Sequence, residues 1–192
     1  ARPSAGPRHL PLPRAQSQPL LVRSAGRSSR GAAGRRPPRR AGSHLTAKDT
    51  GLDLDAVIGD PERRIIVCCG SGGVGKTTLA QVVAARCRRP AVYVVALAEV
   101  SPGADLARVV LDAIGGSAVV NGDPHRDLAA ALSQPGTVLV LDNCEHLAGE
   151  AADLIGPLLV ACPDLRVLAT SRRPLDLAAE HVHRLEALDA AS

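Results

Sequence analysis

A run of eight residues starting at position 70 has the residue types that bind the phosphates of a nucleotide. It is Gly70-Ser71-Gly72-Gly73-Val74-Gly75-Lys76-Thr77 and matches the pattern G-x-x-x-x-G-K-[ST] at every fixed position. The glycines let the backbone curl so that consecutive N–H groups point at phosphate oxygens. In such a loop Lys76 reaches the β- and γ-phosphates, and the hydroxyl of Thr77 binds Mg²⁺. With Thr78 included, these residues predict a site for an adenine nucleotide, ATP or ADP, with Mg²⁺.

The segments on either side of this loop favour the same interpretation. Residues 65–69 form a short apolar run with β-branched side chains, which is typical of a buried parallel strand. Residues 77–88 contain good helix formers with apolar residues at helical spacing. A strand, a glycine loop and a helix in this order place the phosphates at a helix N-terminus, where the dipole and free N–H groups favour anions. An ordinary glycine turn would not account for the Lys-Thr pair.

Asp142 comes directly after another apolar run, residues 137–141. Its carboxylate is therefore expected at the end of a strand, where it would meet the Mg²⁺ held by Thr77. Asp142 would alternatively cap the following helix, with Glu145 completing a capping box, and both roles can coexist. Glu145 is the first candidate to orient or deprotonate the attacking water, and Asn143 is the second.

Arg172 follows the fourth apolar run of the chain, residues 165–169, after Thr170 and Ser171. A cation at this position can reach a γ-phosphate and distinguish ATP from ADP through charge-assisted hydrogen bonds. Arg173 comes next, so a solvated basic turn is an equally good interpretation. Under the first interpretation, the residues acting in catalysis are Lys76, Glu145 and Arg172.

Predicted strands and helices alternate after the loop. Further strands are predicted at residues 91–97, 137–141 and 165–169, and residues 182–185 are predicted to begin one more strand. Helices are predicted at residues 104–114, 125–132 and 147–161. This alternation implies right-handed crossovers and a parallel β-sheet covered on both faces by helices. The fold class we expect is α/β, a three-layer P-loop NTPase core over residues 46–192, with ligands bound beyond the carboxyl ends of the strands.

The N-terminal segment differs in composition from the rest of the chain. Residues 1–43 contain ten Arg, no acidic residue and seven of the fifteen Pro. The whole chain has 23 basic and 19 acidic residues, so residues 44–192 carry 13 basic and 19 acidic residues, a net charge of −6. Without apolar periodicity, residues 1–45 are predicted to form a disordered tail rich in Arg, Pro and Ala. A nucleic-acid-binding arm and an untrue reading frame from GC-rich DNA are the alternatives.

The five cysteines and the distribution of apolar residues indicate in which cellular compartment the protein is expected. No C-x-x-C pair is present, and several cysteines fall on predicted core faces. We therefore expect reduced thiols in a cytoplasmic protein, not a disulfide or zinc framework. No stretch approaches the ~18 uncharged apolar residues of a membrane span, and no secretory signal is visible, so no membrane association is expected.

Two segments of the second half carry a family resemblance. They are VLVLDNCEHL, residues 138–147, and CPDLRVLATSRRPL, residues 162–175. They resemble the nucleotide-binding domain of bacterial signal-transduction ATPases with numerous domains (the STAND class). More narrowly, they resemble the ATPase module of LuxR-type and antibiotic-regulatory transcription factors, and they are akin to the NB-ARC domain of plant resistance and apoptotic proteins. The resemblance covers about residues 64–188.

The resemblance implies a nucleotide-dependent switch that holds ADP when off and exchanges it for ATP and oligomerises when on. It also implies that Lys76 and Thr77 contact the phosphates and Mg²⁺, that Asp142 contacts Mg²⁺ and that Arg172 senses the γ-phosphate. The lid, winged helix, sensor repeats and helix-turn-helix of such regulators do not occur among these residues. With no Met in the chain, we expect a fragment, and DNA contact only through domains outside it.

The chain departs from the family in one respect and resembles a second family in another. The hydrophobic-Gly-Arg-Glu element expected some two dozen residues before the loop has its nearest counterpart in Val57-Ile58-Gly59-Asp60, which lacks the Arg and leaves the adenine contacts unassigned. Residues 64–78 also resemble anion-pump and tail-anchored-protein-targeting ATPases, although Ser71 stands where those proteins have a lysine. The first hypothesis is a slow, Mg²⁺-dependent switch ATPase from a bacterial regulator. The others are a dimeric transport or targeting ATPase and a nucleotide-binding scaffold without turnover.

Overall fold

The computed structural model describes residues 21–24, 60, 62–87, 89–116 and 122–185. In this part of the chain six strands form one sheet in the order β1-β3-β4-β5-β2-β6, and every neighbouring pair is parallel. The strands are β1 (Leu21–Ser24), β2 (Ile65–Cys69), β3 (Ala91–Ala96), β4 (Thr137–Asp142), β5 (Arg166–Ser171) and β6 (Glu180–Arg184). Strand β5 therefore lies between β2, which precedes the glycine loop, and β4, which ends in Asp142.

Two of the central strands are buried along their whole length. All five residues of β2 and all six of β4 are buried, as expected for parallel strands covered on both faces. Successive side chains of a strand point to opposite faces of the sheet. Cys69 packs in the core on one face of the sheet, while Cys68 packs in the core on the other, so these two neighbouring thiols point to opposite faces.

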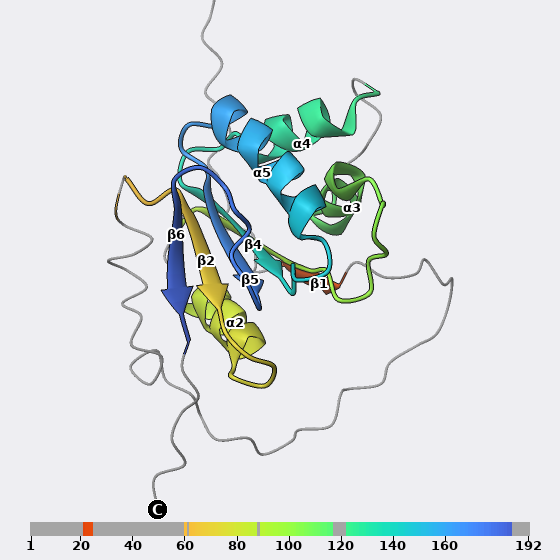
Figure 1. Ribbon diagram of the computed structural model, residues 1–192. Helices are drawn as coiled ribbons and strands as arrows, with labels where there is room; N and C mark the ends of the chain where they lie inside the picture. The colour runs from red at the N-terminus through yellow and green to blue at the C-terminus, as the bar shows by residue number, and fades with distance from the viewer. Residues whose placement is uncertain (1–20, 25–59, 61, 88, 117–121, 186–192) are drawn as a thin grey trace, which may run out of the picture.

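Helices cover both faces of the sheet (Figure 1). Helix α2 (Lys76–Arg86) packs its buried Leu79, Ala80 and Val83 on one face. The other face is covered by α3 (Leu106–Ala113), α4 (Pro124–Leu132) and α5 (Ala148–Ala161). The Asp123 carboxylate accepts a hydrogen bond from the backbone N–H of His125 at 3.0 Å, which caps α4 ahead of Pro124. The predicted three-layer arrangement is confirmed.

The two edges of the sheet differ from the predicted boundaries. Strand β1 pairs with residues 93–96 of β3, although its residues fall in the segment predicted as a tail without secondary structure. Leu21 and Val22 favour strands, and β3 would otherwise present an unpaired edge. The other residues before Asp60 lie outside the described residues, as does the Val57-Ile58-Gly59 fragment, so the domain boundary at residue 45 stays a prediction. At the opposite edge β6 begins at Glu180, two residues before the predicted start.

The parallel strands bring three separate segments to one edge of the sheet. The glycine loop follows the carboxyl end of β2, Asp142 ends β4, and Arg172 follows β5. This edge is where ligands bind in open parallel sheets. Among the helices that the structure describes, none combines the length and the apolar character needed to cross a bilayer.

Candidate functional site

The glycine loop connects β2 to α2 through backbone conformations that suit glycine. Gly75, the residue before α2, has φ 97°, in the left-handed region. Position 70 favours glycine for a different reason, which is the lack of space for a side chain. A Cβ atom built there would lie 2.7 Å from the Val74 Cγ1 and 3.0 Å from the carbonyl oxygen of Leu185. The loop is therefore packed tightly between its own Val74 and the chain that leaves β6, and it reaches the N-terminus of α2 in the predicted strand–loop–helix order.

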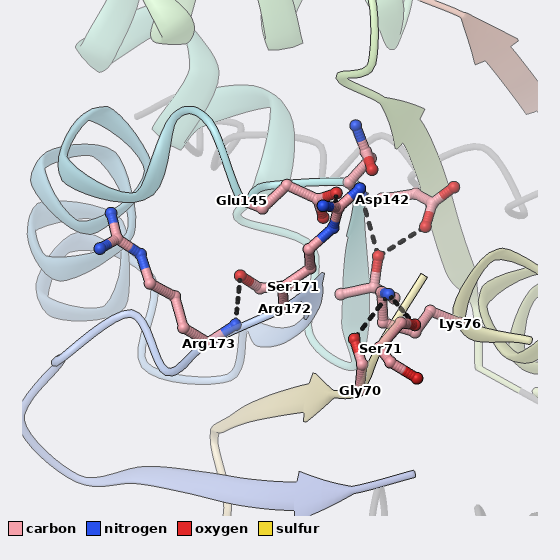
Figure 2. A network of polar contacts seen from close by, with 10 residues as sticks. Gly70, Ser71, Lys76, Asp142, Glu145, Ser171, Arg172 and Arg173 are labelled. Carbon is pink, nitrogen blue, oxygen red and sulfur yellow. Dashed lines mark hydrogen bonds and ion pairs between the residues drawn. The ribbon is translucent and has the colours of Figure 1, made fainter. Parts of the chain in front are cut away.

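Lys76 is the first residue of α2, and its side chain folds back over the loop (Figure 2). The ammonium Nζ donates to the carbonyl oxygens of Gly70 at 2.8 Å and Ser71 at 2.9 Å. The residue is only 9% exposed. The loop thus holds a positive charge at its centre, and both groups that accept hydrogen bonds from this ammonium are neutral carbonyls.

A cavity of about 340 Å³ opens beside the loop at the carboxyl edge of the sheet. It brings together residues from the loop, from the ends of β4 and β5 and from the turn before α5. The lining residues are Gly72, Gly73, Gly75, Lys76, Thr77, Thr78, Asp142, Asn143, Glu145, Thr170 and Arg172. Most residues predicted for the site therefore share one cavity, while Gly70, Ser71 and Val74 complete the loop beside it.

Asp142 is held by Thr170, which the sequence analysis did not single out. The Thr170 Oγ1 hydroxyl donates to the Asp142 Oδ1 at 2.5 Å and accepts a hydrogen bond from the backbone N–H of Asn143 at 2.9 Å. Asp142 is 7% exposed and Thr170 is fully buried. A polar residue directly after the apolar residues 167–169 of β5 is the signal that would have pointed to Thr170, because such a residue reaches the same edge as Asp142 when the two strands are neighbours.

The alternative role of Asp142 as a helix cap is wrong. Leu147 is the N-cap of α5, and no side chain donates or accepts a capping hydrogen bond there. Asn143 has φ 69°, in the left-handed region, so the chain turns away from the helical path directly after Asp142. Asp142 and Glu145 consequently do not form a capping box, and both carboxylates line the cavity.

Arg172 and Glu145 form an ion pair across the mouth of the cavity. The Arg172 Nε lies 2.9 Å from the Glu145 Oε1, and the side chains are 66% and 17% exposed, respectively. With its amide nitrogen facing Glu145, Asn143 also donates to both carboxylate oxygens at 3.1 Å. The neighbouring Arg173 points away from the loop (Figure 2). Arg172, and not Arg173, is therefore the arginine directed at the site.

The oxygen atoms of the cavity fit a magnesium ion. Asp142 supplies a carboxylate and Thr77 a hydroxyl in the same cavity, and Mg²⁺ in proteins prefers one or two carboxylates together with phosphate oxygens and water. In the described part of the chain, no three His, Cys, Asp or Glu residues gather as a metal-binding group. The donor set thus suits a cation that enters with a phosphate ligand and not a metal held by protein side chains alone.

The buried thiol beneath the site has no part in its chemistry. Burial, together with the neighbouring carboxylates of Asp142 and Glu145, raises the pKa of Cys144 to about 12. The thiolate is the nucleophilic form of cysteine, so Cys144 stays protonated and inert at neutral pH. The cavity therefore offers cations, a carboxylate–hydroxyl pair and the loop N–H groups, a combination suited to binding phosphates.

The chain is similar in sequence to one protein family and to mycobacterial proteins. Residues 60–174 match the family model described as "AAA domain". A Mycobacterium tuberculosis protein named as a putative HTH-type transcriptional regulator is 36% identical over 128 residues, which are 66% of this chain and 14% of that protein. A second M. tuberculosis protein is 30% identical over 130 residues, which are 66% of this chain and 33% of its own length.

Two solved structures are similar in outline. A STAND protein with a tetratricopeptide repeat sensor from Pyrococcus horikoshii aligns with a TM-score of 0.49 and 18% identity, over 77% of this chain and 24% of that one. The Thermotoga maritima RuvB Holliday junction branch migration motor aligns with a TM-score of 0.42 and 14% identity, over 74% of this chain and 46% of that one.

Proposed function

The chain belongs to the AAA domain family of P-loop NTPases, and on that premise we propose that it is the nucleotide-dependent switch of a larger bacterial regulator. The switch binds ADP or ATP with Mg²⁺, hydrolyses ATP slowly and acts in the cytoplasm. The observation that carries the proposal is the cavity of about 340 Å³, in which the loop, Lys76, Thr77, Asp142 and Arg172 converge.

The phosphates are proposed to bind along the loop. The N–H groups of the glycine turn and the N-terminus of α2 attract anions, and Lys76 exchanges the carbonyl groups of Gly70 and Ser71 for phosphate oxygens. Bound Mg²⁺ would neutralise charge on the β- and γ-phosphates. Thr77 and Asp142 are the residues proposed to hold it, the latter with its carboxylate fixed by the hydroxyl of Thr170.

Turnover is proposed to depend on Glu145, with Asn143 as the alternative. The Glu145 carboxylate lines the cavity from the turn before α5, at a position from which it can orient a water molecule for attack on the γ-phosphate. Phosphoryl transfer to water requires positioning and charge stabilisation more than a strong base. Because Glu145 is paired with Arg172 in this structure, we propose a slow hydrolytic rate.

The regulatory role is proposed from the relatives. The matched segment spans 14% of the length of the regulators it resembles, so this domain would control other domains of the same chain. Self-association in the ATP state and DNA contact through domains outside residues 1–192 complete the proposal.

Three measurements on one preparation test the proposal. They are the rate of phosphate release from ATP, the amount of ADP retained after gel filtration, and the molar mass with ATP and with ADP. The switch predicts retained ADP, turnover well below the common enzyme median of about 10 s⁻¹, and a larger mass with ATP. Fast turnover in a constant dimer would favour the transport or targeting ATPase, while tight binding with no turnover and no change of mass would favour the scaffold.

A further inference from the structure

The two cations that line the cavity have different partners in this structure. Lys76 donates to two neutral carbonyl oxygens, whereas Arg172 is paired with the Glu145 carboxylate at 2.9 Å. A phosphate that binds Lys76 therefore displaces neutral hydrogen-bond acceptors. A phosphate that binds Arg172 must compete with an anion of the protein itself for the guanidinium group.

This difference separates ADP from ATP. In the proposed mode of binding, ADP uses the loop and Lys76 and leaves the Arg172–Glu145 pair intact. ATP places a third phosphate at Arg172 and has to compete with Glu145 for the same guanidinium group. A ligand shifts an equilibrium only through its differential affinity for the two states. The ion pair therefore lowers the affinity for ATP and leaves the affinity for ADP unaffected.

We infer that Glu145 is a specificity-determining residue that competes internally with the γ-phosphate for Arg172 and biases the site toward ADP. The inference rests on the proposed function and adds to it a residue that sets the ratio of ATP to ADP affinity. It also orders the events at the site, because Glu145 can act on a water molecule only after Arg172 has turned to the nucleotide.

The surroundings of Glu145 allow this exchange. When Arg172 leaves, the Asn143 amide nitrogen, in the orientation that satisfies both groups, still donates to both carboxylate oxygens at 3.1 Å, so the carboxylate does not lose all its donors. Arg172 is 66% exposed, and its guanidinium can move through solvent without disturbing the core. The same exposure means that water screens the pair. The expected effect on the ratio of affinities is therefore modest, about two- to fivefold.

The test measures the dissociation constants of ATP and ADP, both with Mg²⁺, by calorimetry on the full chain. Four proteins are needed: wild type, Glu145→Gln, Arg172→Ala and the double variant. Glu150→Gln is the matched control, because it also removes one carboxylate but that carboxylate contacts the backbone N–H of Gly103, outside the cavity. Melting temperatures verify that each variant is folded, and Glu145→Ala replaces any Glu145→Gln protein that is not.

The inference predicts that Glu145→Gln raises the ratio of ATP to ADP affinity about two- to fivefold, that Glu150→Gln leaves it unchanged, and that Glu145→Gln has no further effect once Arg172 is Ala. An unchanged ratio in Glu145→Gln would overturn it. An equal rise in the Arg172→Ala background would also overturn it, because simple repulsion of the γ-phosphate would then account for the effect. Wild-type protein that binds neither nucleotide would instead refute the proposed function.

Discussion

The Thr170 hydroxyl donates to the Asp142 carboxylate at 2.5 Å, between the ends of two neighbouring strands. The same hydroxyl accepts from the backbone N–H of Asn143, so one oxygen fixes both the carboxylate and the turn that follows it. The carboxylate thus has a defined direction before any metal or nucleotide binds. Such a fixed direction would suit the proposed role of Asp142 in holding Mg²⁺.

Replacing Thr170 by Val should weaken the Mg²⁺-dependent part of ATP binding by about tenfold, because Asp142 loses a charge-assisted hydrogen bond that orients it. Thr170→Ser keeps the hydroxyl and should restore binding. The measurement is ATP affinity by calorimetry with Mg²⁺ and with EDTA.

The matched control for this variant is Thr137→Val. Thr137 is buried at the other end of β4, where its hydroxyl donates to the carbonyl oxygen of Gln134 at 2.6 Å. Its loss should lower the free energy of unfolding by about 1 kcal/mol without altering the Mg²⁺ dependence. If the two Val variants change Mg²⁺ dependence equally, Thr170 has only a structural role.

Arg172→Ala should lower the affinity for ATP about tenfold and leave the affinity for ADP nearly unchanged, because the guanidinium is proposed to contact the γ-phosphate alone. Arg172→Lys should restore only part of the affinity, since an ammonium group cannot make the planar two-pronged contact. Arg173→Ala is the control, because that side chain points away from the loop (Figure 2). Equal losses for ATP and ADP, or equal effects of the two Ala variants, would remove Arg172 from the role of sensor.

The fold followed from the sequence wherever a pattern was local. The β-branched run before Gly70 and the alternation of apolar runs with helical segments both depend on neighbours in the chain, and both are confirmed. Strand order depends on pairing between distant segments, and no local pattern encodes it. The position of β5 between β2 and β4, which brings Thr170 to Asp142, therefore emerged only from the structure.

Side-chain pairing at the site was harder to predict than residue identity. Lys76, Asp142, Glu145 and Arg172 were all selected from the sequence, and all line one cavity. The capping box was wrong because the left-handed conformation of Asn143 delays the start of α5 to Ala148. The Glu145–Arg172 pair joins residues 27 positions apart on adjacent segments, so sequence spacing carried no sign of it.

Alkaline pH should destabilise the fold through Cys144. Burial raises the pKa of this thiol from its usual 9.0 to about 12. The protonated Cys144 thiol makes its full contribution to the free energy of unfolding below pH 9. Between pH 9 and pH 12 that contribution is lost, because the unfolded chain releases the thiol proton that the folded chain retains. Urea denaturation between pH 9 and pH 12 gives the free energy of unfolding at each pH. This free energy should fall with pH more steeply in wild type than in Cys144→Ala, and the two slopes should differ by about 1.4 kcal/mol per pH unit. Identical slopes above pH 9 would contradict the burial of this thiol.

The measurement that tests the account most directly is calorimetric titration of ADP and ATP, with and without Mg²⁺, into wild type and Lys76→Ala. Lys76 is the cation at the centre of the loop, so its loss should weaken both nucleotides about ten- to a hundredfold. Arg86→Ala, an exposed cation in the last turn of the same helix, should bind as wild type does. The predicted result is that wild type binds both nucleotides, that Lys76→Ala binds both more weakly, and that the affinity for ATP depends more on Mg²⁺ than the affinity for ADP does. Unchanged ADP affinity in Lys76→Ala would contradict the assignment of the phosphate-binding loop.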